Sequence, residues 1–115
     1  MRLRDLGIDV VALDVTDPAS IDRFVGDAGR AGGGIDVLIN NAGVAFVAAV
    51  EDSDDERTAV VMDTNFYGPL RLIRAALPIL RSQRRGHIIN VSSLIAKTGR
   101  PFAGVYAASK SALDT

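Results

Sequence analysis

The chain contains three short apolar runs of strand length, and apolar residues recur at helical spacing between them. The runs cover residues 8–15, 35–39 and 88–91, and they are rich in valine and isoleucine, which favour strands. Their apolar character is nearly continuous rather than alternating, a pattern typical of parallel strands covered on both faces. We therefore predict three parallel strands joined by helices.

The segments between these runs carry helix signals. A proline follows Thr16 and Asp17, an arrangement that starts helices. Apolar residues then recur at helical spacing, at Ile21, Phe24, Val25 and Ala28. A longer helix is predicted from residues 53–56, which are mostly acidic, to the basic residues before Gly86. The apolar face of this longer helix comprises Met62, Phe66, Leu70, Ile73, Leu77 and Leu80. A last helix begins near Ala103 and continues to the end of the sequence.

This order of elements predicts a single α/β domain over residues 1–115, doubly wound around a parallel sheet. In such folds ligands bind beyond the carboxyl ends of the strands. The segments that follow the three runs are small and polar, namely residues 14–17, 40–43 and 92–93. Each segment alone is equally typical of turns, but the three together on one sheet edge favour a binding site.

Charge and composition narrow the classes of function. The chain has 13 basic and 14 acidic residues, a net charge of −1, and thus no positive excess for binding nucleic acid or an anionic membrane. It contains no cysteine, which excludes thiolate metal sites and fits a reducing compartment. No apolar run approaches the ~20 residues that span a bilayer. We expect a cytoplasmic protein without a nucleic acid, membrane or metal partner.

Tyr106 and Lys110 lie four residues apart in the last predicted helix and therefore on one helix face. A free phenol has a pKa of ~10, and a nearby ammonium lowers it towards a range useful for proton transfer. A tyrosine with a half-buried ring and a lysine with a solvated charge can also lie four residues apart without any catalytic role. The pair therefore indicates catalysis only together with the other motifs.

That context resembles the short-chain dehydrogenase/reductase family over essentially the whole chain. The resemblance rests on the order and spacing of four motifs: Asn40-Asn41-Ala42-Gly43 after a strand, Asn65 in the long helix, Ser93 after the next strand, and Tyr106-Ala107-Ala108-Ser109-Lys110. The fold it implies is part of a Rossmann fold, lacking the first βαβ unit and the C-terminal strands.

The resemblance also implies catalytic roles. Tyr106 would be the catalytic acid/base, and Ser93 would hydrogen-bond the substrate carbonyl or hydroxyl. Lys110 would bind the nicotinamide ribose and favour the ionised phenol, while Asn65 would hold a water in the proton relay. The implied reaction is hydride transfer between NAD or NADP and a small-molecule alcohol or carbonyl substrate.

Cofactor contacts follow from the same resemblance. The segment 40–43 would support the central sheet and line the cofactor cleft, and Asp14 and Val15 would lie against the adenine. The full set of expected contacts is Asp14, Val15, Asn41, Ala42, Gly43, Tyr106 and Lys110. NAD and NADP are not distinguished, because the family position that chooses between them has no counterpart here.

The family's glycine-rich phosphate turn also has no counterpart. We therefore expect an interior piece of a longer, homo-oligomeric enzyme. Because its strands would lack their neighbours, the 115-residue chain alone is expected to be inactive and poorly folded or aggregated.

One feature of the long helix follows from backbone chemistry. Residue 69 is proline, so the carbonyl of Asn65 has no amide partner four residues on. A kink with a carbonyl free to bind water fits the relay, although a simple bend around the sheet explains Pro69 equally well.

Two alternatives from other classes remain open. A phosphoacceptor receiver domain has a similar length and an aspartate at Asp14, but it needs an aspartate where Asn40 and Asn41 stand. A noncatalytic dinucleotide-sensing protein would share the fold but typically lacks the tyrosine or the lysine.

Overall fold

Two of the three predicted strands form, and they pair in parallel. In this computed structural model, which describes residues 3–30 and 33–114, β1 (Val37–Asn40) lies beside β2 (His87–Asn90). The register sets Val37 opposite His87 and Asn40 opposite Asn90. The α/β class and the parallel sheet are thus confirmed, with each strand within two residues of its predicted bounds.

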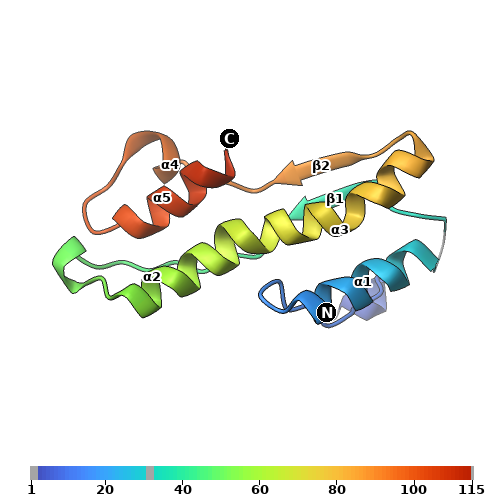
Figure 1. Cartoon of the computed structure of the whole chain (residues 1–115), viewed down its shortest axis with the longest axis horizontal. Coiled ribbons are helices and arrows are strands. Elements are labelled where there is room, and N and C mark those ends of the chain that lie inside the picture. The colour runs from blue at the N-terminus through green and yellow to red at the C-terminus, as the bar shows by residue number, and fades with distance from the viewer. Residues whose placement is uncertain (1–2, 31–32, 115) are drawn as a thin grey trace.

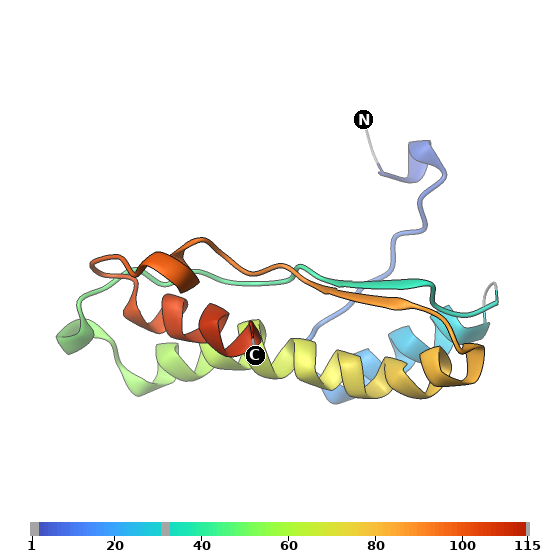
Figure 2. The same cartoon turned by 90° about the horizontal axis from the view of Figure 1, so that it is seen from above.

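The prediction of a strand over residues 8–15 is wrong. These residues adopt no regular structure, and Figure 2 shows the N-terminal segment running away from the two strands. Ile8, Val10 and Val11 are exposed. A strand exists only through hydrogen bonds to a neighbour, and no described segment lies beside this one to accept them.

The helices follow the predicted order with one interruption (Figure 1). A 3-10 turn, η1 (Leu3–Leu6), precedes α1 (Pro18–Arg30), and a second, η2 (Val50–Asp52), precedes α2 (Asp55–Met62). The predicted single long helix is α2 and α3 (Gly68–Gln83), joined by a π-helical turn, η3 (Asp63–Tyr67). After β2 come a short helix that the sequence did not predict, α4 (Ile95–Thr98), and then α5 (Gly104–Leu113). The prediction that the last helix continues to the end is wrong, because it ends at Leu113; Thr115 lies outside the described residues.

The core lies between the helices and one face of the sheet. It consists of Ile21, Val25, Leu38, Leu72, Ala76 and Leu80, from α1, β1 and α3. Figure 2 shows α1, α2, α3 and α5 on one side of the two strands. Accordingly β1 alternates, with Leu38 buried and Ile39 56% exposed. The expectation that both faces are covered is therefore wrong for the described chain.

Loop contacts hold the layers in register at the amino end of the sheet. The Gln83 side chain, at the end of α3, accepts from the Ile35 amide and donates to the Ile35 carbonyl, both at 2.9 Å. This pair of bonds fixes the start of β1 against α3 and directs the carboxyl ends of both strands towards η3. No helix in the described part of the chain is long and apolar enough to cross a membrane.

Candidate active site

The turn η3 interrupts the long helix where the sequence places Pro69. The Gly68 amide donates to the Asp63 carbonyl, five residues back, which defines the wider π turn. Proline lacks an amide hydrogen, so the regular four-residue ladder cannot continue through this point. Single π turns inside α-helices frequently occur at functional sites. The predicted irregularity is present, and it brings Asn65 to the centre of the molecule.

Asn65 is fully buried, and its side chain links three segments of the chain. Its Oδ1 accepts from the Val44 amide at 2.8 Å, and its Nδ2 donates to the Val44 carbonyl and to Ser109 Oγ, each at 2.9 Å. The Ser109 hydroxyl in turn donates to the Tyr106 carbonyl at 2.7 Å. The amide of Asn65 therefore joins the loop after β1 to helix α5, and its side-chain oxygen and nitrogen are both satisfied.

Lys110 lies next to this network and is only 4% exposed. Its Nζ donates to the Val91 carbonyl, just beyond β2, at 2.9 Å. A Cβ added to Gly43 would lie 3.3 Å from Lys110 Nζ and 3.2 Å from Asn65 Oδ1. Glycine at position 43 is thus what lets the ammonium and the amide approach the loop after β1.

The Lys110 ammonium fits the ribose of a nicotinamide cofactor. An ammonium has three donors, and within the described residues one hydrogen bond is found, to Val91. A buried charge with spare donors is costly unless other acceptors reach it. Sugar hydroxyls are acceptors of the required kind, so this donor set agrees with the expected cofactor.

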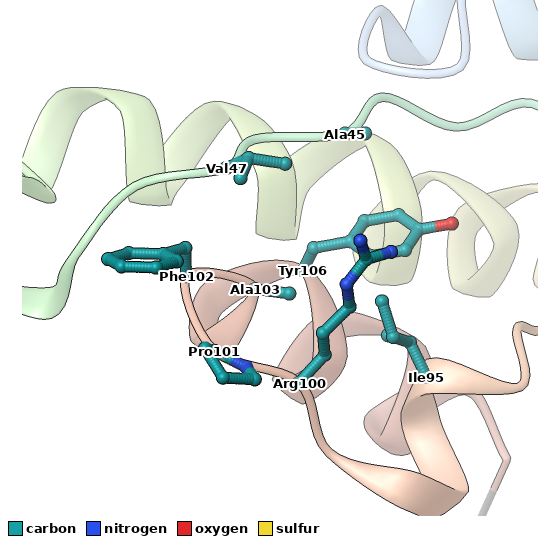
Figure 3. Close-up of a pocket in the computed structure, with 8 residues that line it drawn as sticks. All are labelled: Ala45, Val47, Ile95, Arg100, Pro101, Phe102, Ala103 and Tyr106. Carbon is teal, nitrogen blue, oxygen red and sulfur yellow. The ribbon is translucent and has the colours of Figure 1, made fainter.

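Tyr106 opens onto a pocket of about 510 Å³. The pocket lies between the loop after β1 and the segment that leads into α5 (Figure 3). It is lined by Ala45, Val47, Ile95, Arg100, Pro101, Phe102, Ala103 and Tyr106. Within this lining the Tyr106 hydroxyl and the Arg100 guanidinium are the polar side-chain groups, so a ligand here would meet apolar walls, one phenol and one guanidinium.

The serines after β2 lie at the start of α4. Ser93 is partly buried, and its Oγ accepts from the Ile95 amide at 3.4 Å. Ser92 Oγ donates to the Lys110 carbonyl at 3.4 Å. Ser93 is not among the described residues that line the Tyr106 pocket. Its role towards the substrate stays a prediction.

Asp14 and Val15 occupy the loop before α1. Hydrogen bonds from the Thr16 hydroxyl, at 2.7 Å, and from the Thr16 amide, at 2.8 Å, hold the pKa of Asp14 below its usual value. Val15 is buried, and a Cβ on Gly68 would lie only 2.8 Å from Val15 Cγ2. Val15 therefore packs closely against Gly68, which lies three residues beyond Asn65. Contact of Asp14 and Val15 with adenine stays a prediction.

The segment 40–43 divides into a buried and an exposed part. Asn40 is buried, and its Nδ2 donates to Asn90 Oδ1 across the strand pair at 2.8 Å. This bond gives Asn40 a sheet-supporting position. Asn41, Ala42 and Gly43 are exposed beyond the strand end, where a cofactor can reach their backbone.

Sequence reasoning missed three residues that shape the site. Val44 and Ser109 supply the partners of Asn65, and Arg100 supplies the charge of the pocket. Ser109 lies within the motif from Tyr106 to Lys110, so its position in the sequence could have indicated a role. Val44 takes part through its backbone, so its side-chain type gives no such indication. No group of three or more potential metal ligands occurs among residues 3–30 and 33–114.

The family follows from comparison with known sequences. The sequence model of the short chain dehydrogenase family matches residues 2–115. The chain therefore belongs to the short-chain dehydrogenase family, and the resemblance in its motifs is confirmed. The receiver-domain alternative has no support.

Individual relatives agree with this assignment. A 3-ketodihydrosphingosine reductase of Bacteroides thetaiotaomicron is 39% identical over 107 residues, which are 93% of this chain and 40% of that protein. The chain spans 31% to 40% of the length of the first curated relatives it matches. A metagenomic short-chain oxidoreductase in complex with NADP superposes with a TM-score of 0.86 at 33% identity, over 92% of this chain and 48% of that one.

An NAD⁺-bound xylitol dehydrogenase superposes with a TM-score of 0.88 at 30% identity, over 96% of this chain and 44% of that one. The two neighbours hold NADP and NAD⁺ respectively, so both nicotinamide cofactors occur among the structural neighbours of this chain. The neighbours also confirm the expected Rossmann-type fold, of which this chain has two parallel strands.

Proposed function

We propose that the natural full-length protein containing these residues is an NAD(P)-dependent oxidoreductase that interconverts an alcohol and a ketone or aldehyde, with Tyr106 as the acid/base. The observation that carries the proposal is the buried Lys110 ammonium. It is held by the Val91 carbonyl beside Gly43 and lies on the same helix as Tyr106, one turn away.

In this mechanism the bound nicotinamide supplies or accepts the hydride at the carbonyl carbon. The residues of the chain handle the proton and the geometry. Tyr106 donates its phenolic proton to the substrate oxygen during reduction and accepts it during oxidation. The positive charge of Lys110 stabilises negative charge on the phenol oxygen during transfer. Asn65 positions both by holding α5 against the loop after β1.

The proposed substrate class is an apolar alcohol or ketone. The pocket beside Tyr106 has mostly aliphatic and aromatic walls, which favour burial of hydrocarbon over binding of a sugar. The name of the reductase from Bacteroides thetaiotaomicron indicates a long-chain ketone as its substrate, which agrees with this class.

The test uses the two lysines of the chain. Lys110→Met should weaken NADH or NADPH binding and lower kcat/KM for an apolar ketone at least about 100-fold. Lys97→Met is the matched control, because Lys97 is exposed and pairs with Asp114 at 2.9 Å. Equal losses in both variants, or none in either, would contradict the proposal. Cofactor binding without turnover in the wild type would favour a dinucleotide sensor instead.

We further propose that the 115 residues alone do not turn over substrate. Their apolar strand residues Val37 and Ile39 are 47% and 56% exposed, and exposed sheet surface promotes association. Size-exclusion chromatography and a cofactor-oxidation assay on the isolated chain test this. A monomeric, active chain would overturn it.

A further inference from the structure

The pocket beside Tyr106 contains a charged group that the proposed hydride and proton transfers do not use. Of its eight lining residues, Arg100 alone carries a charge at neutral pH. In Figure 3 the Arg100 side chain extends from its loop and overlaps the Tyr106 ring in this view. Arg100 is an exposed residue, so water screens part of its charge, but it places one cation beside otherwise apolar walls.

The loop that carries Arg100 is held in place on both sides. The Ala103 amide donates to the Arg100 carbonyl at 3.2 Å, closing a turn, and the Ala48 amide donates to the Phe102 carbonyl at 2.8 Å. Phe102 has φ of 64°, in the left-handed region that bulky residues rarely adopt. Such conformations persist where surrounding contacts enforce them and cluster at ligand sites. The loop therefore holds the backbone of Arg100 in place beside the pocket.

Arg100 has no acidic partner among the described residues, unlike Arg57 and Arg71. Arg57 pairs with Asp54 at 3.5 Å, and Arg71 pairs with Asp63 at 2.7 Å. Within residues 3–30 and 33–114, no ion pair or side-chain hydrogen bond involves the Arg100 guanidinium. Its donors are free to bind a ligand, and a planar guanidinium matches carboxylate and phosphate oxygens in a two-point arrangement.

We propose that Arg100 is a specificity-determining residue that binds an oxyanion group, a carboxylate or a phosphate ester, on a substrate with an apolar body. This inference rests on the proposed function, because it places the reacting carbonyl of that substrate at Tyr106. The hydrocarbon part lies against Val47, Ile95 and Phe102, and the anionic group lies at the guanidinium. The proposed substrate keeps its apolar body and carries one anionic group in addition.

The test is a binding measurement on the natural full-length protein, which needs no turnover. Octanoate, octyl phosphate and octanol are titrated into the wild type, Arg100→Gln and Arg100→Lys by calorimetry. We expect Arg100→Gln to weaken octanoate or octyl phosphate binding about tenfold or more and to leave octanol unchanged. Arg100→Lys should retain part of the affinity, because it keeps the charge but loses the two-point geometry.

Arg74→Gln is the matched control, since Arg74 is an exposed arginine on α3 that does not line the pocket. The anion that loses more affinity in Arg100→Gln identifies carboxylate or phosphate as the preferred group. Equal anion affinity in the wild type and Arg100→Gln, or an equal loss in Arg74→Gln, would overturn the proposal.

A parallel assay separates this inference from the proposed function. The wild type and Arg100→Gln are supplied with cofactor and either a medium-chain oxo acid or its neutral methyl ester. Turnover of the ester by both proteins, with the oxo acid affected in Arg100→Gln alone, supports both proposals. Turnover without any change in Arg100→Gln overturns the role of Arg100 only. A failure to reduce either ketone, with anion binding intact, overturns the proposed function only.

Discussion

The junction around η3 and the two-stranded sheet bury opposite kinds of side chain. At the junction two polar residues, Asn65 and Ser109, are fully buried. In the sheet two apolar residues, Val37 and Ile39, are about half exposed. The polar residues are buried because their hydrogen-bond partners lie within the chain, which offsets the cost of removing them from water. The sheet residues stay exposed because no described segment covers their face. Partner availability decides burial here more than side-chain polarity.

The largest effect is expected from Asn65→Leu, which keeps the volume and removes the hydrogen bonds. The Val44 amide and carbonyl and the buried Ser109 hydroxyl would lose Asn65 as a partner. Val44 is 39% exposed, so water replaces part of its bonds, whereas a buried group left unsatisfied costs ~1–3 kcal/mol. We expect the natural full-length protein to lose about 3 kcal/mol of unfolding free energy in urea. Asn41→Leu, at an exposed neighbouring asparagine, is the control and should change stability little. Similar losses of unfolding free energy in both variants would contradict the contribution of the Asn65 hydrogen bonds to stability.

Two glycines provide a second contrast. Gly68→Ala should destabilise by ~1–3 kcal/mol through overpacking, because its Cβ would lie 2.8 Å from Val15 Cγ2 and 3.2 Å from the Val15 carbonyl oxygen. Gly26→Ala in α1 should stabilise, because its Cβ would meet only the Arg30 side chain at 3.5 Å and alanine is the better helix former. Urea unfolding of both variants should give opposite signs, and a shared sign would contradict the packing described for Gly68.

Association through the exposed face of the sheet can be tested in the 115-residue chain. Ile39→Thr removes apolar surface from an exposed strand face, and we expect it to raise the monomeric fraction in size-exclusion chromatography. Val50→Thr is the control, since Val50 is 83% exposed but lies in the short turn η2. If the Val50 variant has the larger effect, association does not occur through the sheet.

The smallest effect is expected in how the stability of the fold depends on pH. The Ser92 hydroxyl and then the Lys97 ammonium lower the pKa of Asp114 below its ordinary 3.8. The folded state therefore favours the charged carboxylate, so this contribution is present above pH 3.8 and is lost as the pH falls below it. Asp114→Asn should lower stability at neutral pH and make little difference in acid. Ser92→Ala, which removes the larger cause, should reproduce most of this pattern; a pH-independent difference for Asp114→Asn would contradict it.

The elements predicted correctly are those with local signals. Helical spacing and a proline start located α1, and the apolar spacing of α3 located its core face. The segment 8–15 was predicted wrongly because a strand depends on a neighbour that a local pattern does not reveal. The sequence predicted the π turn only in part. Pro69 indicated an interruption, but it did not indicate the hydrogen bond from the Gly68 amide to the Asp63 carbonyl, five residues back.

The residues of the candidate site also differ in whether a local sequence pattern reveals them. Tyr106 and Lys110 were singled out by spacing within one helix, which a sequence displays directly. The bonds of Asn65 to Val44 and Ser109 span 21 and 44 residues and involve a backbone group, so no local pattern predicts them. Arg100 could not be recognised either, because its importance lies in having apolar neighbours and no acidic partner.

The most direct test of the central claim compares the two tyrosines of the chain in the natural full-length protein. Hydride transfer from NADH or NADPH to an apolar ketone is measured in a single turnover for Tyr106→Phe and Tyr67→Phe. Tyr106→Phe should slow transfer by at least about 100-fold, the usual contribution of a positioned acid/base, with cofactor binding and unfolding unchanged. Tyr67 does not line the pocket and its ring lies tilted beside that of Phe66, so this variant should keep the rate of transfer. Equal transfer rates in the two variants would contradict the assignment of Tyr106 as the proton donor.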